Sequence, residues 1–281
     1  MKNVFIILNY NDASTTISYL NTIKKFINVD YIIVVDNCST DNSLKELSNI
    51  KSNKIKIIKT NQNKGYAYGN NYGIKYAINK YKKCNLIISN PDILISESAF
   101  NELITIINSN SEIGILAPTI KESNKLNRGW KISSAYDELI LSIPRFGKKY
   151  RANYLEYKAD YYKDDLSQVD IVSGCFFIIK SSVIKSINYF DENTFLYYEE
   201  NILGVKMQQK KYRTYISNNV YVIHNHSISI NKSVNNVNKF KMLKQSQLYY
   251  LKNYCHSNFI INGLIYIFSK IIILNIKLKS K

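Results

Sequence analysis

The stretch Leu86-Ile87-Ile88-Ser89-Asn90-Pro91-Asp92 is a short apolar run that ends abruptly in a turn sequence. An apolar run of this length, bounded by Asn-Pro-Asp, is typical of a buried β-strand. In open α/β sheets, ligands bind in the crevice beyond the carboxyl ends of the strands. We therefore expect Asp92 at the edge of a sheet, where a ligand would bind.

Three earlier apolar runs predict further strands, and a helical pattern follows each of them. The predicted strands are residues 4–8, 31–35 and 55–58, and the predicted helices are residues 14–27, 41–50 and 66–81. Continuous apolar strands that alternate with helices favour a parallel sheet covered on both faces. The loops after these strands should open at one common edge.

The second half of the chain is less regular. Ser96 can cap a helix, and an apolar strand over residues 113–117 should be stopped by Pro118. Residues 121–168 are polar, rich in Tyr and Lys, and lack a clear period, so they could be an acceptor-facing insertion, a mobile loop or a plain surface excursion. Later strands are predicted at 169–172, 175–179, 215–216 and 220–223, with helices at 181–187 and within 191–212.

The composition is strongly basic. Lysine and arginine together number 38 among 281 residues, and the formal net charge is +17. The only arginines are Arg128, Arg145, Arg151 and Arg213. Nucleic-acid-binding proteins usually carry arginine clusters that contact phosphates in bidentate fashion. We therefore expect attraction to anionic substrates and to an anionic membrane face, and no nucleic-acid partner.

The two terminal segments and the cysteines indicate the cellular location. Residues 4–8 are too short an apolar run for a signal peptide, and the four cysteines form no CxxC pair, so a reduced cytoplasmic setting is expected. Residues 259–276 are apolar but interrupted, and lysines follow them. We expect a helix lying in the plane of the cytoplasmic membrane face, with a buried helix or a dimer seam as the alternatives.

Several side chains that could carry chemistry follow predicted strands. Asp36 ends a strand and could accept hydrogen bonds from a nucleobase or a ribose, or only cap the next turn. Asp92 could bind a divalent cation that bridges a diphosphate. His224 and His226 follow another strand end, and one of them could complete such a metal site, although a single histidine is more often structural.

Two further motifs are weak when taken alone. Asn63-Lys64-Gly65, followed by Asn70-Asn71, could place a close-lying backbone turn and a helix N-terminus over a ribose or diphosphate, or be a solvated turn. Glu199 and Glu200 follow the aromatic run 195–198. Burial against aromatic rings raises the pKa of a carboxyl group toward that of a useful base, whereas acidic residues also simply favour helix N-termini.

Taken together and in order, these motifs resemble the family 2 inverting glycosyltransferases of the GT-A fold, most closely the bacterial rhamnosyltransferase-like branch. The resemblance covers about residues 3 to 230. The matching stretches are Leu8-Asn9-Tyr10-Asn11, Val35-Asp36-Asn37 with Ser39 and Asp41, Asn63-Lys64-Gly65-Tyr66-Ala67 with Gly69-Asn70-Asn71, Asn90-Pro91-Asp92, Ser173-Gly174, Phe190-Asp191-Glu192, Tyr198-Glu199-Glu200 and His224 to Ser227.

The resemblance implies a mainly parallel, mixed GT-A sheet covered by helices, with an amphipathic helical tail. It divides the chain into a glycosyltransferase domain at 1–230 and a membrane-associating segment at 231–281. Within the domain, residues 1–95 would bind the nucleotide sugar and residues 96–230 would form the acceptor and catalytic half. Nucleotide-sugar-binding residues would be Asn9, Tyr10, Asn11, Asp36, Asn63, Gly65, Asn70, Asn90 and Asp92.

The resemblance also implies chemistry. Asp92, with His226 or His224, would hold Mg or Mn on the diphosphate, and Glu200 or Glu199 would deprotonate the acceptor hydroxyl. The expected reaction transfers a sugar from dTDP-rhamnose or a UDP-sugar, with inversion, to a lipid-linked surface polysaccharide. Two departures stand out: the usual two-carboxylate metal motif is reduced to Asn-Pro-Asp, and the usual Glu-Asp pair is Glu-Glu.

A scaffold protein is the alternative from another functional class, and two other enzyme classes are disfavoured. A non-catalytic homologue could keep nucleotide binding and act as a scaffold in a polysaccharide assembly complex. A sugar nucleotidyltransferase or a dinucleotide-dependent oxidoreductase would need a glycine-rich loop after the first strand, and residues 8–13 contain no glycine. A homodimer through the C-terminal helices is also possible.

Overall fold

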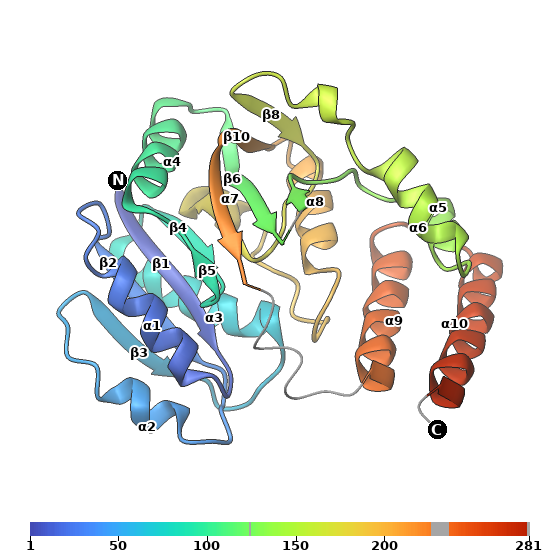
Figure 1. The fold of residues 1–281 in the computed structure, drawn as a ribbon, viewed down its shortest axis with the longest axis horizontal. Helices are drawn as coiled ribbons and strands as arrows, with labels where there is room; N and C mark the ends of the chain where they lie inside the picture. Colours follow the sequence, from blue (N-terminus) through green and yellow to red (C-terminus); the bar gives the residue numbers. More distant parts are fainter. Residues whose placement is uncertain (124, 226–235, 280–281) are drawn as a thin grey trace.

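The computed structural model describes residues 1–123, 125–225 and 236–279, which form a mixed α/β sheet with helices packed around it (Figure 1). The strands are β1 Lys2–Asn9, β2 Tyr31–Asp36, β3 Ile55–Lys59, β4 Cys84–Ser89, β5 Ile93–Leu94, β6 Ile113–Glu122, β7 Lys125–Asn127, β8 Leu166–Val169, β9 Phe176–Lys180 and β10 Arg213–His224.

The helices lie between and after these strands. They are α1 Ala13–Ile23, α2 Ser43–Ser48, α3 Tyr66–Tyr81, α4 Glu97–Ser109, α5 Ala135–Leu141, α6 Phe146–Tyr150, α7 Ser181–Ser186, α8 Glu199–Gln209, α9 Asn236–Asn253 and α10 Phe259–Lys279, with a π-helical turn Arg151–Leu155 and a 3₁₀ turn Ala159–Tyr161.

The first four strands form the parallel part of the sheet. The strand order is β3-β2-β1-β4-β9-β6-β10-β5, and β7 and β8 pair with β6 and β10. Strands β3, β2, β1 and β4 run parallel, and the register sets Asn9 opposite Asp36. The carboxyl ends of these strands therefore meet at one edge, as the alternating sequence pattern predicts.

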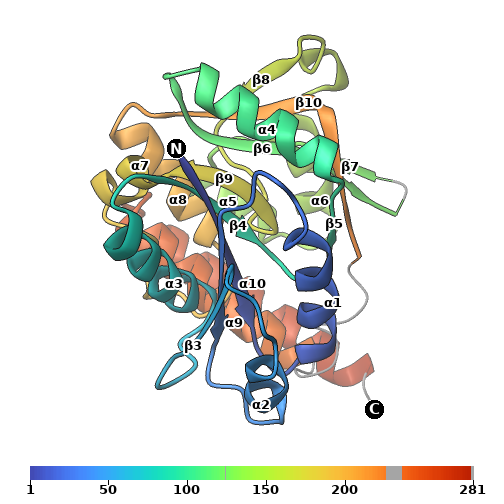
Figure 2. The ribbon, with the colours of Figure 1, turned by 90° about the vertical axis from the view of Figure 1, so that its left-hand side faces the viewer.

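Side chains alternate between the two faces of the sheet, and each face has its own core. From β1, Phe5 and Ile7 join the core that includes residues of α1 and α4. Val4 and Ile6 join the opposite core, with residues of α3, α7 and α8. Figure 2 shows these helices on the two sides of the sheet. Because strand side chains alternate with a period of two, a continuous apolar run can serve both cores.

Pro118 does not stop its strand, contrary to the expectation from sequence. Strand β6 runs through it to Glu122, and its pairing with β10 shifts register between Ser217 and Tyr221. An irregularity of this kind accommodates a residue that cannot donate a backbone hydrogen bond. The extension matters because it carries Glu122 to the end of the sheet. The two predicted strands at 215–216 and 220–223 are one irregular strand, β10.

Residues 121–168 are also more ordered than their composition suggests. They contain β7, α5, α6, two irregular helical turns and β8. Helix α5 begins with a capping box, in which the side chain of Ser134 accepts from the backbone of Asp137 and the Asp137 carboxylate accepts from Ser134. Such reciprocal caps stabilise a helix too short to show a clear apolar period.

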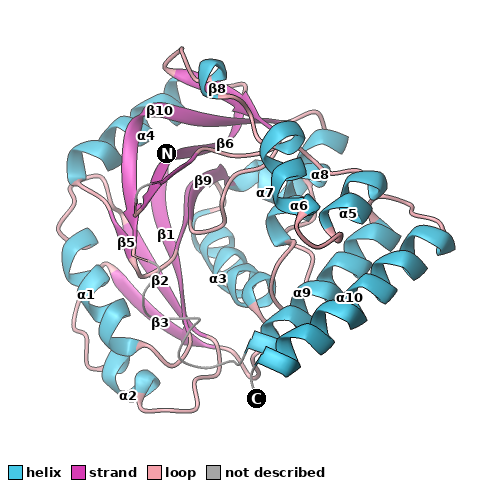
Figure 3. Ribbon diagram, turned by 45° about the vertical axis from the view of Figure 1, so that its right-hand side comes forward, coloured by secondary structure: helices cyan, strands magenta, loops and turns pink. Residues whose placement is uncertain are grey.

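The C-terminal helices α9 and α10 pack on each other beside the sheet domain, with α10 also against α5 (Figure 3). Ile265 and Ser269 of α10 are buried, whereas Phe259, Ile267 and Leu274 are more than half exposed. Within the described ranges, no helix is long and apolar enough to cross a membrane.

Candidate active site

Asp36 lies at the end of β2 and organises the first loop of the site. Its carboxylate accepts from the side-chain amide of Asn9 and from the backbone N–H of Ser39, both at 3.1 Å. Asn9 in turn accepts from the Thr16 hydroxyl at 2.8 Å. Asp36 is 0% exposed and Asn9 is 1% exposed. Both side chains therefore hold the loops from beneath and do not line an open surface.

Asn11 and Tyr10 are the exposed side of the same loop. Asn11 has a positive φ of 54°, and its backbone N–H donates to the Ser39 hydroxyl at 3.0 Å. Its side-chain oxygen accepts from the backbone of Thr40 at 2.8 Å. Asparagine tolerates this backbone conformation better than most residues. Tyr10 is 39% exposed beside it, so these two residues are available to a ligand above Asp36.

The turn at Gly65 lies next to the same loop. Asn63 accepts from the backbone N–H of Gly65 and from the Asn37 side chain, both at 2.9 Å. Gly65 has a φ of 92°, and a Cβ there would lie only 1.8 Å from the carbonyl oxygen of Phe195. Only glycine fits this position without a shift of the backbone. The turn therefore packs directly against the loop that leads to Glu199.

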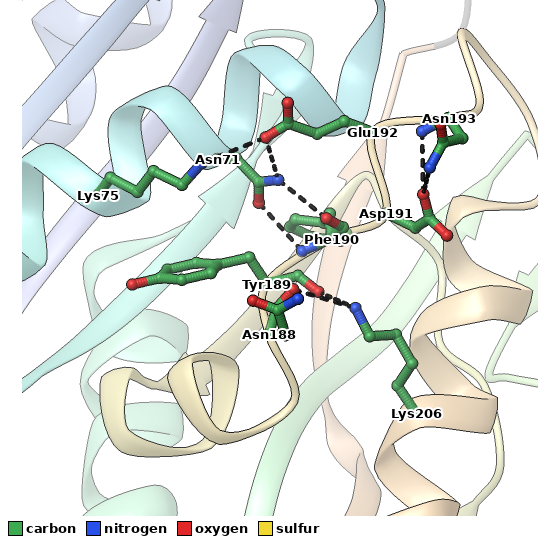
Figure 4. Close-up of polar contacts among 9 residues, drawn as sticks. All are labelled: Asn71, Lys75, Asn188, Tyr189, Phe190, Asp191, Glu192, Asn193 and Lys206. Atoms are coloured by element: carbon green, nitrogen blue, oxygen red, sulfur yellow. Dashed lines mark hydrogen bonds and ion pairs between the residues drawn. The ribbon is translucent and has the colours of Figure 1, made fainter.

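Asn70 and Asn71, which are expected beside the nucleoside, both make internal hydrogen bonds. Asn70 is buried and donates to the carbonyl of Tyr66 within its own helix at 3.0 Å. Asn71 donates to the carbonyl of Phe190 at 2.9 Å and accepts from its backbone N–H at 3.0 Å (Figure 4). It also donates to Glu192 at 2.8 Å. Asn71 thus fixes the loop before Glu199 to α3.

Asp92 meets His224 at the end of β10. Asp92 Oδ1 lies 3.3 Å from His224 Nε2, and both side chains are 7% exposed. On the other side of the imidazole ring, Glu122 Oε1 lies 3.1 Å from Nδ1. A carboxylate on the far nitrogen is the usual way in which a protein orients a metal-binding histidine. Glu122 therefore supports the orientation that directs Nε2 to Asp92.

These residues fit a divalent cation. Asp92 Oδ1 is buried, and its only contact among the described residues is with His224 Nε2 at 3.3 Å. Carboxylate oxygen and imidazole nitrogen are both common metal ligands. The described ranges contain no group of three or more His, Cys, Asp or Glu that could hold a metal. His226, the other expected ligand, lies outside the described residues. A cation here would therefore depend on additional ligands such as phosphate oxygens.

The pKa of His224 responds to the same neighbours. Burial lowers it, but hydrogen bonds with Asp92, Cys175 and Glu122 outweigh burial and raise the pKa of His224 to about 12. The ring therefore carries a proton between two carboxylates when no cation competes for Nε2. Metal binding at Nε2 would release that proton.

Glu199 and Glu200 begin α8, after two strained residues. Tyr197 and Tyr198 have positive φ values of 74° and 69°, a conformation that is uncommon for aromatic residues and is maintained only by surrounding contacts. Glu199 is 5% exposed, and its Oε1 has no hydrogen-bond partner within the described part of the chain. Glu200 is partly buried and accepts from the backbone N–H of Gly174 at 3.2 Å.

Both carboxyl groups have raised pKa values. Burial, followed by repulsion from Glu200, raises the pKa of Glu199 to about 8. Burial also raises the pKa of Glu200, although the Gly174 N–H and the charge of Arg151 act in the opposite direction. Two adjacent buried carboxyl groups disfavour double ionisation. Near neutral pH, Glu199 therefore retains a proton. The Gly174 N–H and Arg151 favour the charged form of Glu200.

Residues 173–175 join the parts of the site. Besides the Gly174 contact with Glu200, the carbonyl of Gly174 accepts from the Tyr66 hydroxyl at 2.6 Å. The carbonyl of Cys175 accepts from the backbone N–H of Asn90 at 2.8 Å. The same loop thus contacts the glutamate pair, α3 and the turn that carries Asp92. Among the expected site residues, this loop contacts Glu200 and Asn90 directly.

The sequence patterns do not indicate the contact of Glu122 with His224 or the strained backbone of Tyr198. They place Asn71 beside the nucleoside and do not indicate its contact with Phe190. Glu122 could have been noticed as a carboxylate two residues after an apolar strand, had that strand not been ended at Pro118. Asn71 stood in a matching stretch, but its contact with Phe190 spans 119 residues of sequence. The positive φ of Tyr198 has no sequence signal, because tyrosine does not favour it.

Comparison with known proteins agrees with this architecture. Two solved structures of similar fold are GalNAc-T7 with UDP, GalNAc and Mn²⁺ and the mannosyltransferase PcManGT from Pyrobaculum calidifontis with GDP-Man and Mn²⁺. The first has a TM-score of 0.56 and 14% identity, and the match covers 80% of this chain and 44% of that one. The second has a TM-score of 0.58 and 11% identity, covering 95% and 73%. These likenesses confirm the GT-A fold.

Among curated proteins, the chain is similar to the low-salt glycan biosynthesis hexosyltransferase Agl10 of Haloferax volcanii. They are 27% identical over 197 residues, which is 69% of this chain and 58% of that protein, so this chain spans little more than half of its relative. The family model "Glycosyl transferase family 2" matches residues 4–187. That match contains β1 to β4 with their loops, the turn at Asp92 and the loop at Gly174, and on it the chain belongs to glycosyl transferase family 2.

Proposed function

We propose that this protein transfers a hexose from a nucleotide diphosphate sugar, such as dTDP-rhamnose or a UDP-sugar, to a hydroxyl group of a growing surface polysaccharide, with inversion. The observation that carries the proposal is the arrangement around residues 173–175. Gly174 of this loop contacts Glu200 of the glutamate pair, whose pKa values are raised, and Cys175 contacts His224 of the Asp92–His224 pair. Inversion requires a base and a leaving-group site on opposite sides of the reacting carbon.

The donor would bind over the loops after β1, β2 and β3. Asn11 and Tyr10 would contact the nucleoside, while Asp36 and Asn9 would hold these loops from beneath. Asn63 and Gly65 bring backbone close to the same space, and Asn90 holds the turn of Asp92 to Cys175. Asp36 is fully buried, so we assign it a positioning role unless donor binding opens the turn above it.

Asp92 and His224 would hold Mg or Mn, with His226 as a further candidate. When bound, such a cation would neutralise negative charge that develops on the departing diphosphate. Asp92 supplies one carboxylate where the usual motif supplies two, and we propose that His224, oriented by Glu122, replaces the second ligand. The UDP and GDP-Man complexes of similar fold also contain Mn²⁺, which supports a divalent cation.

Glu200 is the proposed general base. It is partly open and fixed by the Gly174 N–H, so it can accept the proton of an acceptor hydroxyl as the oxygen attacks. Glu199 is more buried and retains its own proton near neutral pH. We propose that Glu199 sets the environment of Glu200, with the reverse assignment as the alternative.

The acceptor is proposed to be lipid-linked and presented at the cytoplasmic face of the cell membrane. Helix α10 exposes large apolar residues on a chain of net charge +17. Apolar side chains combined with basic charge favour binding at an anionic lipid surface without crossing it. A second copy of the chain could cover the same face instead.

The first test is the Glu200→Gln variant. Transfer from the donor, or donor hydrolysis by water, should fall by about 10²–10⁴-fold, because positioned acid–base catalysis contributes that much. Nucleotide-sugar binding, measured by calorimetry, should stay within about twofold of the parent, since Glu200 contributes mainly to the transition state. Near-normal turnover in Glu200→Gln with a strong loss in Glu199→Gln would reverse the assignment of the two glutamates.

A non-catalytic scaffold that binds nucleotide is the alternative from another class. Thermal unfolding and donor hydrolysis distinguish such a scaffold from an enzyme. Both are measured with UDP-glucose, dTDP-rhamnose and GDP-mannose, each with and without MnCl₂. A scaffold would be stabilised by donor, because ligand binding raises stability with the logarithm of concentration, yet would release no nucleotide diphosphate. The enzyme would do both.

A further inference from the structure

Glu138, on α5, is a buried carboxylate that the proposed chemistry does not use. It is 1% exposed. Its Oε1 accepts from the Ser133 hydroxyl at 2.5 Å, and its Oε2 accepts from the Gln247 amide at 2.6 Å and from the hydroxyl of Tyr198. The donors come from the segment before α5, from α9 and from the loop before Glu199. One carboxylate therefore joins three separate parts of the molecule.

In this junction, both oxygens of the Glu138 carboxylate have hydrogen-bond donors. Three donors satisfy the two oxygens, and Lys244 lies nearby, donating to Gln247 Oε1 at 2.7 Å and to Ser142 at 3.2 Å. Burial lowers the pKa of Lys244, and the negative charge of Glu138 opposes that shift. A buried carboxylate without such partners would be strongly destabilising. Removing any one donor should therefore loosen the whole junction.

Tyr198 is the member of the junction that reaches the catalytic pair. Its φ is 69°, it directly precedes Glu199, and its carbonyl accepts from the backbone of Ile202 in the first turn of α8 at 2.9 Å. Its ring lies 5.3 Å from that of Tyr250. A residue held in this conformation costs roughly 1–3 kcal/mol and depends on its surroundings to stay there. The Glu138 bond is one of those contacts.

Helix α9 holds the rest of the same loop. The Ser246 hydroxyl donates to the carbonyl of Leu196 at 2.8 Å. The hydroxyls of Tyr249 on α9 and of Tyr254 just after it both donate to Asp191, at 2.8 and 2.5 Å. The loop from Asp191 to Tyr198 is thus fixed by α9 on one side, while Asn71 fixes its start to α3 on the other.

We propose that Glu138 is a positioning residue for catalysis. Through its hydrogen bonds with Tyr198 and Gln247, it holds the strained backbone that precedes Glu199 and Glu200. The position of the catalytic base therefore depends on how α9 packs. This inference rests on the function proposed above. It makes α9 part of the catalytic machinery although none of its residues is expected to touch substrate.

The experiment compares Tyr198→Phe and Glu138→Gln with the parent full-length chain. Donor hydrolysis is followed with UDP-glucose, dTDP-rhamnose and GDP-mannose in the presence of MnCl₂. In both variants kcat should fall by about 10–100-fold, because a small misplacement of a catalytic group is costly. KM for the donor should change by less than about threefold, since the nucleotide loops are untouched. Equal kcat in a folded Tyr198→Phe variant would overturn the proposal.

Tyr150→Phe is the matched control. The Tyr150 hydroxyl donates to Asp137, the neighbour of Glu138 on α5, at 2.6 Å. This bond does not involve the loop at residues 191–198 that precedes Glu199. The control removes the same kind of bond from the same helix and should keep kcat. The double variant Tyr198→Phe with Glu138→Gln should be no slower than the slower single variant, because the bond that Tyr198→Phe removes is one that Glu138→Gln already weakens. Additive losses would contradict action through Tyr198.

A second measurement does not depend on turnover. In the parent, Glu199 faces Glu200 on its own helix, Tyr197 in the loop and Tyr66 from α3. If Tyr198→Phe loosens the loop, water reaches Glu199, and the fall of melting temperature with rising pH should become shallower between about pH 4.5 and 8. An unchanged slope would refute the positioning role, whereas an inactive parent would refute only the proposed function.

Discussion

Glu199 carries a pH dependence that can be measured without knowing the substrate. Its pKa is about 8 in the folded protein, against 4.5 for an ordinary glutamate. Between these values the folded state binds more protons than the unfolded state, so stability is fully present below about pH 4.5 and falls as pH rises toward 8. The buried carboxylate becomes a charged, poorly compensated group above that range.

Glu199→Gln should therefore stabilise the protein at high pH. We expect the free energy of unfolding to rise by roughly 1–3 kcal/mol at pH 9, the usual penalty for an unsatisfied buried group. The gain should nearly vanish at pH 5. Urea denaturation at the two pH values measures it, and Glu102→Gln, at an exposed position of α4, is the control. A gain that is equal at both pH values would show that the charge of Glu199 is not the cause.

Glu122 gives a second prediction for a single residue. Glu122→Gln should weaken Mn²⁺ binding by about 10–100-fold, because the residue that orients a metal-binding histidine contributes that much. Calorimetric titration of MnCl₂ in the presence of UDP measures the effect independently of turnover. Glu112→Gln removes an exposed carboxylate just before the same strand and should leave the affinity unchanged. Identical affinities in all three proteins would exclude Glu122 from the site.

Among the structural elements, the turn at Gly65 packs against the loop at residues 191–198, which precedes Glu199 and is called the catalytic loop here. Gly65→Ala would place a methyl group against the Phe195 carbonyl at a positive φ, so we expect a loss of stability of about 1–3 kcal/mol. Gly263→Ala is the matched control, because nothing lies within 4 Å of its Cβ position on α10. It should be neutral or stabilising by up to about 1 kcal/mol. Thermal unfolding distinguishes the two.

The elements differ in how far the sequence predicts them. The strands from β1 to β4 were evident because each is a short apolar run followed by a helix, and their register alone brings Asn9 to Asp36. The predicted end of β6 at Pro118 is wrong because the register shift in the partner strand β10 has no signal in the sequence near Pro118. Helix α5 was missed because a reciprocal cap, with Ser134 and Asp137, replaces an apolar period. The Glu138 junction joins residues up to 109 positions apart, and no local pattern announces it.

In the whole molecule, the catalytic loop lies between the sheet domain and the α9–α10 pair. Asn71 binds the loop to the sheet side, and Ser246 and Tyr249 bind it to α9. Helix α10 packs on α9 and α5 and exposes apolar side chains on its other side. A surface that covers α10 is therefore linked to the glutamate pair through α10, α9 and the loop at residues 191–198. A membrane that binds α10 would therefore also help to fix the position of Glu200.

The exposed side of α10 makes the final prediction. Ile267 and Ile271 are 54% and 47% exposed, and Lys270 lies between them in an exposed position. Replacing both isoleucines by glutamine should lower binding to phosphatidylglycerol vesicles by roughly tenfold or more, because fully burying one isoleucine side chain contributes about 1.5–3 kcal/mol. Sedimentation of protein with vesicles measures it, and binding of the parent should weaken at high salt.

Ile27→Gln is the control for this experiment, since Ile27 is 80% exposed but precedes β2, far along the chain from α10. It should leave vesicle binding unchanged. Equal sedimentation of the parent and the α10 variant would remove α10 as the anchor. If the variant instead converted a dimer to a monomer in analytical ultracentrifugation without vesicles, a second copy of the chain would be the occupant. The basic charge would then act on substrate attraction and not on membrane seating, because a dimer seam excludes lipid from the same face.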